Sequence, residues 1–322
     1  MRGMRTRALA AADSFEPRAL PLAVIRSIFA VAELIGIIWT PDRALFVHEP
    51  GLPDGMRCAG IRGLSLWCVV GPSPGGLIGS RIVATVILVA VISGYRPRWT
   101  CVPQWFVTFS MTASVTLPYG ADMVAAIATM LLIPVLLGDD RTWHWARPHH
   151  PLSPMWRGSA YAAWWALRCQ IAIIYFDSAI SKITVPQWRD GTAMYTVFVD
   201  PNYGLPPVFR HALGPVLSSE IVIGLITWSV ISIELGIAVC ALAGRRGRRA
   251  GVVLAILLHG GIILAVGLVS FGLIMIALVL SLCLDVSKSR WVCDTPERPV
   301  TAAAVQDGVD GPSPTIRAVQ GD

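Results

Sequence analysis

Residues 249–286 read RAGVVLAILLHGGIILAVGLVSFGLIMIALVLSLCLDV, an apolar stretch that is too long for a single membrane crossing. The hydrocarbon core of a bilayer is roughly 30 Å thick, so one helical crossing needs about 20 mostly apolar residues. We therefore expect two consecutive membrane helices, over 249–267 and 268–286, which meet around Gly267.

Six further segments have the composition of membrane helices, and the third of them is short and bounded by Pro103 and Pro118. These segments lie at 21–40, 76–94, 103–117, 121–138, 160–182 and 220–243. Over all 322 residues, 54% are hydrophobic and only 14% are charged, which excludes a cytosolic enzyme and a disordered protein. The sequence predicts an all-α fold: a polytopic membrane helical bundle of about eight transmembrane helices, with seven to nine compatible.

The placement of Lys and Arg predicts the orientation, because these residues in short loops resist translocation. With the N-terminus inside, seventeen loop cations fall on the cytoplasmic side and five outside. We therefore expect a multi-pass protein of the cell membrane whose N-terminus and C-terminus are both cytoplasmic, with external segments at about 41–75 and 183–219. Trp39, Trp67 and Trp99 lie close to span ends, as expected of an aromatic belt.

Three regions follow from this pattern. Residues 1–19 form a basic cytoplasmic segment, 20–287 form the transmembrane domain, and 288–322 are rich in Pro, Ala and Gly. The last region cannot bury a core, so we expect a disordered cytoplasmic tail. The lipid bilayer is the expected partner of the apolar segments, and the modest excess of basic residues does not indicate nucleic acid.

Cysteines and histidines offer limited chemistry. Cys58 and Cys68 share the first external segment, where an oxidising compartment would permit a disulfide, although they can also be two unrelated thiols. The loop DDRTWHWARPHHP at 139–151 groups three histidines, but no CxxC motif or helical His pair supports a metal site. We expect no bound metal.

Ionisable residues inside the predicted spans are more informative, because a charge at the bilayer centre costs roughly 2.5–3.5 kcal/mol on insertion scales. Arg168, Tyr175 and Lys182 are spaced by seven and seven, so they share one helical face. Gln170 and Asp177 lie on another face, which predicts contacts on two sides and a central helix.

Two further ionisable groups lie in later spans. Glu234 lies in the 220–243 span and His259 in the 249–267 span, and either can pair with the polar groups of 160–182. Such pairs can simply join helices, or they can form a site. Lys182 lies at the external end of its span, where it can reach water or, if enclosed, act as a base.

The segment RCQIAIIYFDSAISKITVPQWRDGTAMY at 168–195 resembles the signature of the horizontally transferred transmembrane domain of the vitamin K-dependent gamma-carboxylase superfamily. The similar positions are Tyr175-Phe176, Ala179, Lys182, Trp188 and Asp190-Gly191. His259, Phe271 and Met275 also match that pattern, and Glu234 falls where the domain commonly carries a helix-borne Glu.

Within that superfamily the chain most resembles the bacterial sporulation-delaying protein B family. GLSLWC, SGYRPRWTCVPQW, LPYGADMV and DDRTWHW carry this second resemblance, and the two together cover about residues 20–285.

The resemblance implies a function class. Lys182 matches the lysine held to deprotonate a vitamin K hydroquinone, so a quinol such as menaquinol is the implied cofactor. The chain departs from the carboxylase in having 117–122 as LPYGAD instead of an Asn-His step, and it lacks the large luminal region. Glutamate carboxylation is therefore not expected, although a gamma-carboxylase-like membrane enzyme with quinol-linked chemistry is compatible.

The functional hypothesis is an integral membrane protein that matures or modifies a secreted peptide of the antimicrobial-toxin type at the external face. Lys182 and His259 are the candidate catalytic residues; Arg168, Tyr175, Trp188, Gly191 and Glu234 are the candidate pocket residues. The expected partners are a secreted peptide precursor and a small soluble protein. A non-catalytic scaffold, chaperone or immunity component is the alternative. A transporter ranks last, because the sequence shows no inverted repeat and no paired Gly/Pro-broken helices.

Overall fold

The computed structural model describes residues 10–52, 54–116, 120–201 and 203–284, and within these ranges the regular structure is helical. The long helices are α2 (Leu20–Trp39), α5 (Pro74–Ser93), α6 (Pro97–Ser114), α7 (Gly120–Leu136), α8 (Pro154–Thr184), α13 (Glu220–Leu242), α14 (Arg245–Val266) and α15 (Val269–Leu280). The shorter elements are α3 (Asp42–Leu45), η1 (Gly60–Leu64), α4 (Leu66–Val70), α9 (Pro186–Arg189), α10 (Ala193–Val199), α11 (Pro207–Ala212), α12 (Gly214–Leu217) and η2 (Ser281–Cys283). The all-α prediction is confirmed for the described residues.

Proline and glycine set the ends of several long helices. Proline occupies the first turn of α2, α5, α6 and α8, where its missing N–H would have no helical partner in any case. Gly94 ends α5 and Gly267 ends α14, both in the left-handed conformation that glycine adopts without steric cost. The predicted division of the last apolar stretch around Gly267 therefore agrees with the boundary between α14 and α15.

Two predicted boundaries are wrong. Pro103 does not begin the third segment but lies inside α6, which starts at Pro97, the position where proline favours a helix start. The basic residues Arg245, Arg246 and Arg248, which lie between the predicted spans 220–243 and 249–267, form the first turns of α14. Arg248 is buried there and donates to the carbonyl oxygen of Leu282, so tertiary contacts extend the helix beyond its apolar part.

Four of the described helices, α2, α5, α13 and α14, are long and apolar enough to cross a membrane. α7 and the α15–η2 segment are apolar but shorter, while α6 and α8 do not meet the same measure of length and composition. The chain is thus a helical protein with at least these four candidate spans. The remaining crossings of the predicted eight stay a prediction.

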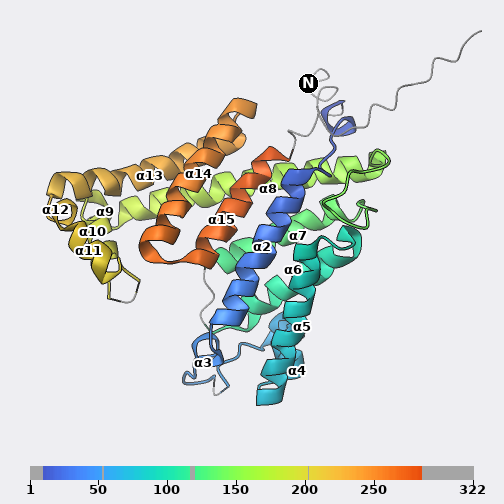
Figure 1. Cartoon of the computed structure of the whole chain (residues 1–322), viewed down its shortest axis with the longest axis horizontal. Coiled ribbons are helices and arrows are strands. Elements are labelled where there is room, and N and C mark those ends of the chain that lie inside the picture. The colour runs from blue at the N-terminus through green and yellow to red at the C-terminus, as the bar shows by residue number, and fades with distance from the viewer. Residues whose placement is uncertain (1–9, 53, 117–119, 202, 285–322) are drawn as a thin grey trace, which may run out of the picture. The chain divides into compact units, whose positions relative to one another are not determined.

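Figure 1 shows the arrangement of the helices. Two clusters of buried apolar side chains hold them together. The larger cluster is formed by residues of α2, α7, α8, α13, α14 and α15, and α8 packs along α13 on one side and α7 on another. The smaller cluster joins α2, α4, α5 and α6 around Trp67. Trp67 is therefore a core residue and not part of an aromatic belt, because α4 folds back against α5 and α6.

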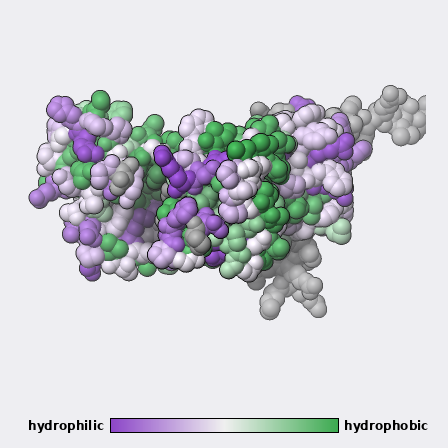
Figure 2. All heavy atoms as spheres, turned by 90° about the horizontal axis from the view of Figure 1, so that it is seen from below, coloured by the Kyte–Doolittle hydropathy of each residue, from purple (hydrophilic) through white to green (hydrophobic). Residues whose placement is uncertain are grey.

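The outer surfaces of the apolar helices expose large hydrophobic side chains. Ile221 and Leu225 of α13 and Leu264 of α14 are each more than 60% exposed. Figure 2 shows one face of the molecule, on which hydrophobic side chains lie among hydrophilic ones. Exposed apolar surface of this kind on long helices is expected where lipid replaces water as the solvent.

The predicted regions differ in how far the structure covers them. The predicted tail at 288–322 lies outside the described residues, as do 1–9 and the segment 117–119. Seven of the seventeen cations counted on the cytoplasmic side also lie outside them: Arg2, Arg5, Arg7, Lys288, Arg290, Arg298 and Arg317.

Candidate functional site

The ammonium group of Lys182, near the C-terminal end of α8, is held by three strong hydrogen bonds. Nζ lies 2.8 Å from Oε1 and 2.9 Å from Oε2 of Glu234 on α13, and 2.7 Å from Oγ of Ser178. The Ser178 hydroxyl in turn donates to Oε1 of Glu234 at 3.1 Å. The Lys182 side chain is 22% exposed and that of Glu234 is 9% exposed, so this interhelical ion pair is largely removed from solvent.

A second polar pair lies on the same face of α8. The hydroxyl of Tyr175 is 2.7 Å from Nε2 of His259 on α14, and both side chains are buried. The direction of that hydrogen bond depends on the histidine tautomer. Nδ1 of His259 has no hydrogen-bond partner, and the Phe271 ring lies 5.7 Å away between ring centroids. The site thus contains one unsatisfied buried polar atom.

Helical periodicity explains why these groups come together. Tyr175, Ser178 and Lys182 stand at positions i, i+3 and i+7 of α8, so they lie on one face over a rise of about 10 Å. α13 packs along this helix and along α14, which places Glu234 and His259 against successive turns of α8. Both pairings that the sequence permitted are present, and Ser178 joins them as an additional residue.

Ser178 is the member of the site that sequence reasoning missed. Its position four residues before Lys182 on the same helical face is the signal that could have identified it. Because its hydroxyl accepts from Lys182 and donates to Glu234, it links the two charges and orients the carboxylate.

Arg168 does not join this group, although it shares the α8 face. Its Nε donates to the carbonyl oxygen of Ala241 at 2.9 Å, and Nη2 donates to that of Ala243 at 3.1 Å. The guanidinium also lies over Trp165, 3.9 Å from the ring centroid. Arg168 therefore satisfies carbonyl groups at the C-terminal end of α13, where a cation is also favoured by the helix dipole.

Trp188 and Gly191 follow α8 and shape the segment beside the ion pair. The Trp188 ring centroid is 5.4 Å from Nζ of Lys182, within the range of a cation–π contact. Gly191 has a positive φ of 85°, and a Cβ at this position would approach the Gly224 Cα to 3.1 Å. Its carbonyl oxygen accepts from Thr227 at 2.8 Å, which fastens this segment to α13.

Asp190 belongs to the same turn but serves it locally. Its carboxylate accepts from the hydroxyl and the backbone N–H of Thr192, and these two hydrogen bonds hold the pKa of Asp190 below its usual value. The side chain is exposed, so the acidic-glycine step seen in the sequence is a turn-forming feature here.

The second polar face of α8, which carries Gln170 and Asp177, does not make the polar contacts that were predicted for it. Asp177 is exposed, and both polar atoms of the Gln170 side chain lack a hydrogen-bond partner. The prediction of contacts on two polar faces is wrong for Asp177, because none of the described helices covers that side chain. Spacing reveals which residues share a face but not which faces find a neighbour.

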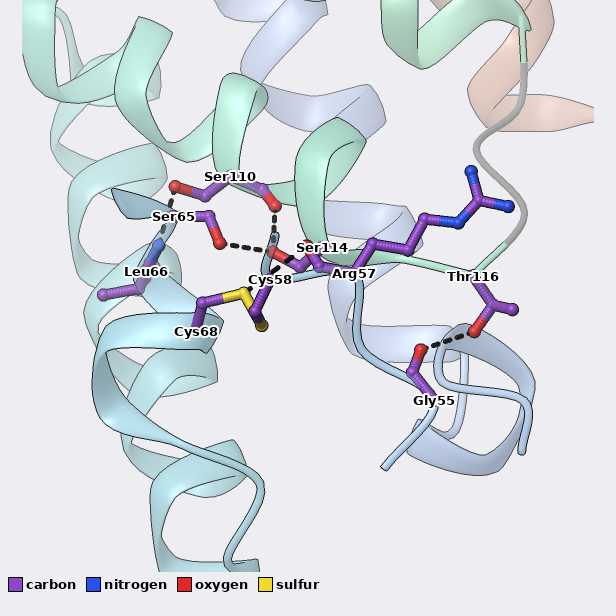
Figure 3. Close-up of a disulfide and its surroundings, with 9 residues drawn as sticks. All are labelled: Gly55, Arg57, Cys58, Ser65, Leu66, Cys68, Ser110, Ser114 and Thr116. Atoms are coloured by element: carbon purple, nitrogen blue, oxygen red, sulfur yellow. Dashed lines mark hydrogen bonds between the residues drawn. A yellow bond between two sulfur atoms is a disulfide. The ribbon is translucent and has the colours of Figure 1, made fainter. Parts of the chain in front are cut away.

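Cys58 and Cys68 form a disulfide with a Cα–Cα distance of 5.6 Å (Figure 3). The surrounding segment is fastened to the end of α6, since the backbone N–H of Arg57 donates to the Ser114 carbonyl oxygen. The hydroxyl groups of Ser114 and Ser65 lie 2.9 Å apart. The disulfide therefore belongs to a well-anchored loop.

A further buried polar group lies away from Lys182, between α2 and α6. Nε of Arg26 donates to Oε1 of Gln104 at 3.0 Å, and Nη2 donates to Oγ1 of Thr100 at 2.6 Å. Glu33, two turns along α2, is buried with no hydrogen-bond partner for either carboxylate oxygen. Among the described residues, no group of three His, Cys, Asp or Glu side chains is arranged to hold a metal ion.

Comparison with known proteins finds two relatives from Bacillus subtilis (strain 168). An uncharacterized protein, YitO, is 29% identical over 269 residues, which is 83% of this chain and 86% of that protein. The sporulation-delaying protein SdpB is 29% identical over 266 residues, which is 82% of this chain and 81% of SdpB. No family model and no solved structure matches the chain. These similarities and the four apolar helices support a membrane protein of an SdpB-like kind.

Proposed function

We propose that this protein matures or modifies a secreted peptide at the external membrane face, and that Lys182 with Glu234 is its functional centre. The observation that carries the proposal is the interhelical Lys182–Glu234 ion pair, continued on the same α8 face by the Tyr175–His259 pair. Ionisable groups inside a membrane bundle are costly, and they commonly mark functional sites. The likeness to SdpB over most of both chains supplies the context of the proposal.

The ion pair offers proton chemistry without a change in net charge. Transfer of one proton from Nζ of Lys182 to the Glu234 carboxylate, 2.8 Å away, leaves an amine and a carboxylic acid. The amine can then accept a proton from a substrate group, while the carboxylic acid can donate one. Ser178 contacts both partners and so holds their relative position in either state.

A quinol is compatible with the residues present, as the resemblance to the gamma-carboxylase superfamily implies. Nδ1 of His259 is buried without a partner, and the Phe271 ring provides an adjacent apolar wall. His259 and Tyr175 would hold a quinol hydroxyl, and Phe271 would contact its ring. Such a group, when bound, would supply reducing equivalents and an ionisable hydroxyl.

The proposed membrane arrangement has eight crossings with both termini cytoplasmic. The eight apolar segments of the sequence support this count, four of them on helices long and apolar enough to span a membrane, and the distribution of Lys and Arg favours this orientation. It places the C-terminal end of α8, with Lys182 and the loop carrying the Cys58–Cys68 disulfide, on the external side. That side is also the one on which a disulfide is expected to persist.

Mass spectrometry of secreted peptides tests the proposal. Cells would carry the wild-type protein, a deletion, Lys182→Met or Glu234→Gln at matched protein levels. Arg62→Met is the control, because it removes an exposed cation from the other segment assigned to the external side. The proposal requires both site variants to reproduce the mass profile of the deletion while the control matches the wild type.

A non-catalytic scaffold for the peptide is the second candidate, and one observation favours it. Both oxygens of Glu234 and the Ser178 hydroxyl already engage Lys182, as in a contact that only joins α8 to α13. A scaffold predicts that Lys182→Met and Glu234→Gln leave the mass profile unchanged. If the mass profiles of both variants match that of the wild type, the scaffold hypothesis replaces the hypothesis of a maturing enzyme.

A further inference from the structure

A small cavity of about 70 Å³ opens where the α7–α8 loop meets the start of α2. The residues that line it are Arg18, Ala19, Leu20, Arg141, His144, Trp145, Ala146, Arg147 and Pro148. A larger cavity of about 440 Å³ shares Arg141, Ala146 and Arg147, and adds His149 and His150. Three arginines from two distant parts of the sequence thus converge at this end of the bundle, some helical turns away from the Lys182 site.

The carboxylates nearby hold two of these arginines in place. Arg141 forms a buried ion pair with Asp139, with Nη2 2.7 Å from Oδ2, and its Nη1 donates to the carbonyl oxygens of His144 and Ala146. Arg18 forms ion pairs with Glu16 at 2.8 Å and with Asp140 at 3.3 Å. These contacts fix both guanidinium groups against the loop before any ligand arrives.

Each of these two guanidinium groups keeps donor capacity after those contacts. A guanidinium has five N–H groups, and four hydrogen bonds are formed by Arg18 and four by Arg141. One N–H of each therefore remains for a ligand that lies in the cavity they line. Fixed guanidinium N–H groups are well suited to a phosphate, whose oxygens accept several charge-assisted hydrogen bonds.

His144 supplies an independent indication of a ligand. His144 is one of the lining residues, it is only 2% exposed, and neither ring nitrogen has a hydrogen-bond partner. The ring edge that carries Nε2 lies against Gly94, at the end of α5. Burial, then the charges of Arg26 and Arg141, lower its pKa to about 3, so the ring is neutral near pH 7 with one N–H to donate. A buried polar group without a partner is unusual, because its desolvation is then uncompensated.

The surroundings add to this pattern. The N-terminal turn of the 20-residue helix α2 adjoins the cavity, and its N-cap, Ala19, provides no side-chain hydrogen bond. No carboxylate lines the smaller cavity, and Asp140 lines the larger one. Trp143 and Trp145 of the same loop are each 47% exposed, as expected of a surface near lipid headgroups.

We propose that this arginine cavity binds a phosphate group, with Arg18, Arg141, Arg147 and His144 as its donors. The phosphate is either that of an anionic phospholipid headgroup or that of a soluble phosphate compound. The site is separate from Lys182, so its occupancy does not depend on the peptide-maturation function.

The test uses the full-length protein purified in detergent, with two probes. Native mass spectrometry measures binding of phosphatidylglycerol compared with phosphatidylcholine, and calorimetry measures binding of inorganic phosphate. Arg147→Gln is the main variant, because Arg147 is exposed and lies outside the buried Arg141–Asp139 ion pair, so its replacement leaves that pair intact. His144→Asn is the second variant. Arg98→Gln is the control, because it removes an exposed cation from the nearby start of α6.

We expect the dissociation constant of the bound probe to rise about tenfold in Arg147→Gln and in His144→Asn. In Arg98→Gln it should rise less than about twofold. Tight binding of phosphatidylglycerol alone identifies a lipid headgroup, and binding of inorganic phosphate identifies a soluble phosphate compound. The proposal is overturned if neither probe binds the wild type. Equal weakening by Arg98→Gln and Arg147→Gln also overturns it, because that result is a general charge effect.

Discussion

The Lys182–Glu234 contact allows a quantitative test of how much an interhelical ion pair contributes in this bundle. At 2.8 Å and an effective dielectric constant of about 20, the attraction of two unit charges is about 6 kcal/mol before desolvation is subtracted. Removing one partner of a fully buried pair costs about 3–5 kcal/mol. Because the Lys182 side chain is 22% exposed, solvent screens part of this, and we expect a coupling energy of about 1.5–3 kcal/mol.

A double-mutant cycle measures that coupling directly. The variants are Lys182→Met, Glu234→Gln and the double substitution, and the free energy of unfolding is followed in mixed micelles by circular dichroism. Each single variant should be less stable than the wild type, because it leaves a buried group without its partner, and the double variant should recover part of the loss.

The comparison value comes from interhelical hydrogen bonds in membrane bundles, which average about 0.6 kcal/mol. A coupling energy well above that value would show that the charges, and not only the hydrogen bonds, join α8 to α13. A coupling energy at or below about 0.5 kcal/mol would refute the reasoning, because it would mean that the two groups are solvated independently. Ser178→Ala serves as a further check, since it removes one hydrogen-bond acceptor from Lys182 and one donor from Glu234 without changing charge.

Three further outcomes are expected. Gly191→Ala should lower stability by about 1–2 kcal/mol, because an L-residue at φ 85° is strained; unchanged thermal unfolding would contradict this. Replacing Cys58 and Cys68 together by Ser should cost about 2–3 kcal/mol, from the entropy of the ten-residue loop they close, and reductant should then have no additional effect on unfolding. Burial alone would raise the pKa of Glu16, but hydrogen bonding and the charge of Arg18 outweigh it and hold the pKa below its usual value. Its stabilising contribution is therefore present above about pH 4.3, the value of the unfolded chain, and is lost as pH falls through the lower folded pKa; Glu16→Gln should abolish that part of the acid dependence of unfolding.

Much of the fold could be predicted because apolar length and helix-ending residues are local properties. The eight segments correspond to eight long helices, and Gly267 divides the last two by its left-handed conformation. Boundaries failed where distant contacts extend a helix, as at Arg248, whose guanidinium reaches Leu282. By length and composition alone, only four of the described helices are long and apolar enough to cross a membrane.

The candidate site could be predicted in part. Seven-residue spacing placed Arg168, Tyr175 and Lys182 on one face of α8, which is a property of the helix itself. Spacing did not distinguish their partners, and Arg168 turned out to cap the end of α13, away from Glu234. Ser178 remained unrecognised because a serine in a helix has many structural uses.

The sequence by itself determined that apolar helices of this protein suit a membrane, that its fold is helical, and which helix face each ionisable residue occupies. These properties depend on hydropathy and on a period of 3.6 residues, which are set by neighbours in the chain. Tertiary structure alone decided which faces meet. It paired Lys182 with Glu234 and Tyr175 with His259, and it left Asp177 exposed. It also brought Arg18 to the loop of Arg141 and His144, because contacts between residues more than a hundred positions apart depend on how helices pack and not on the order of residues within them.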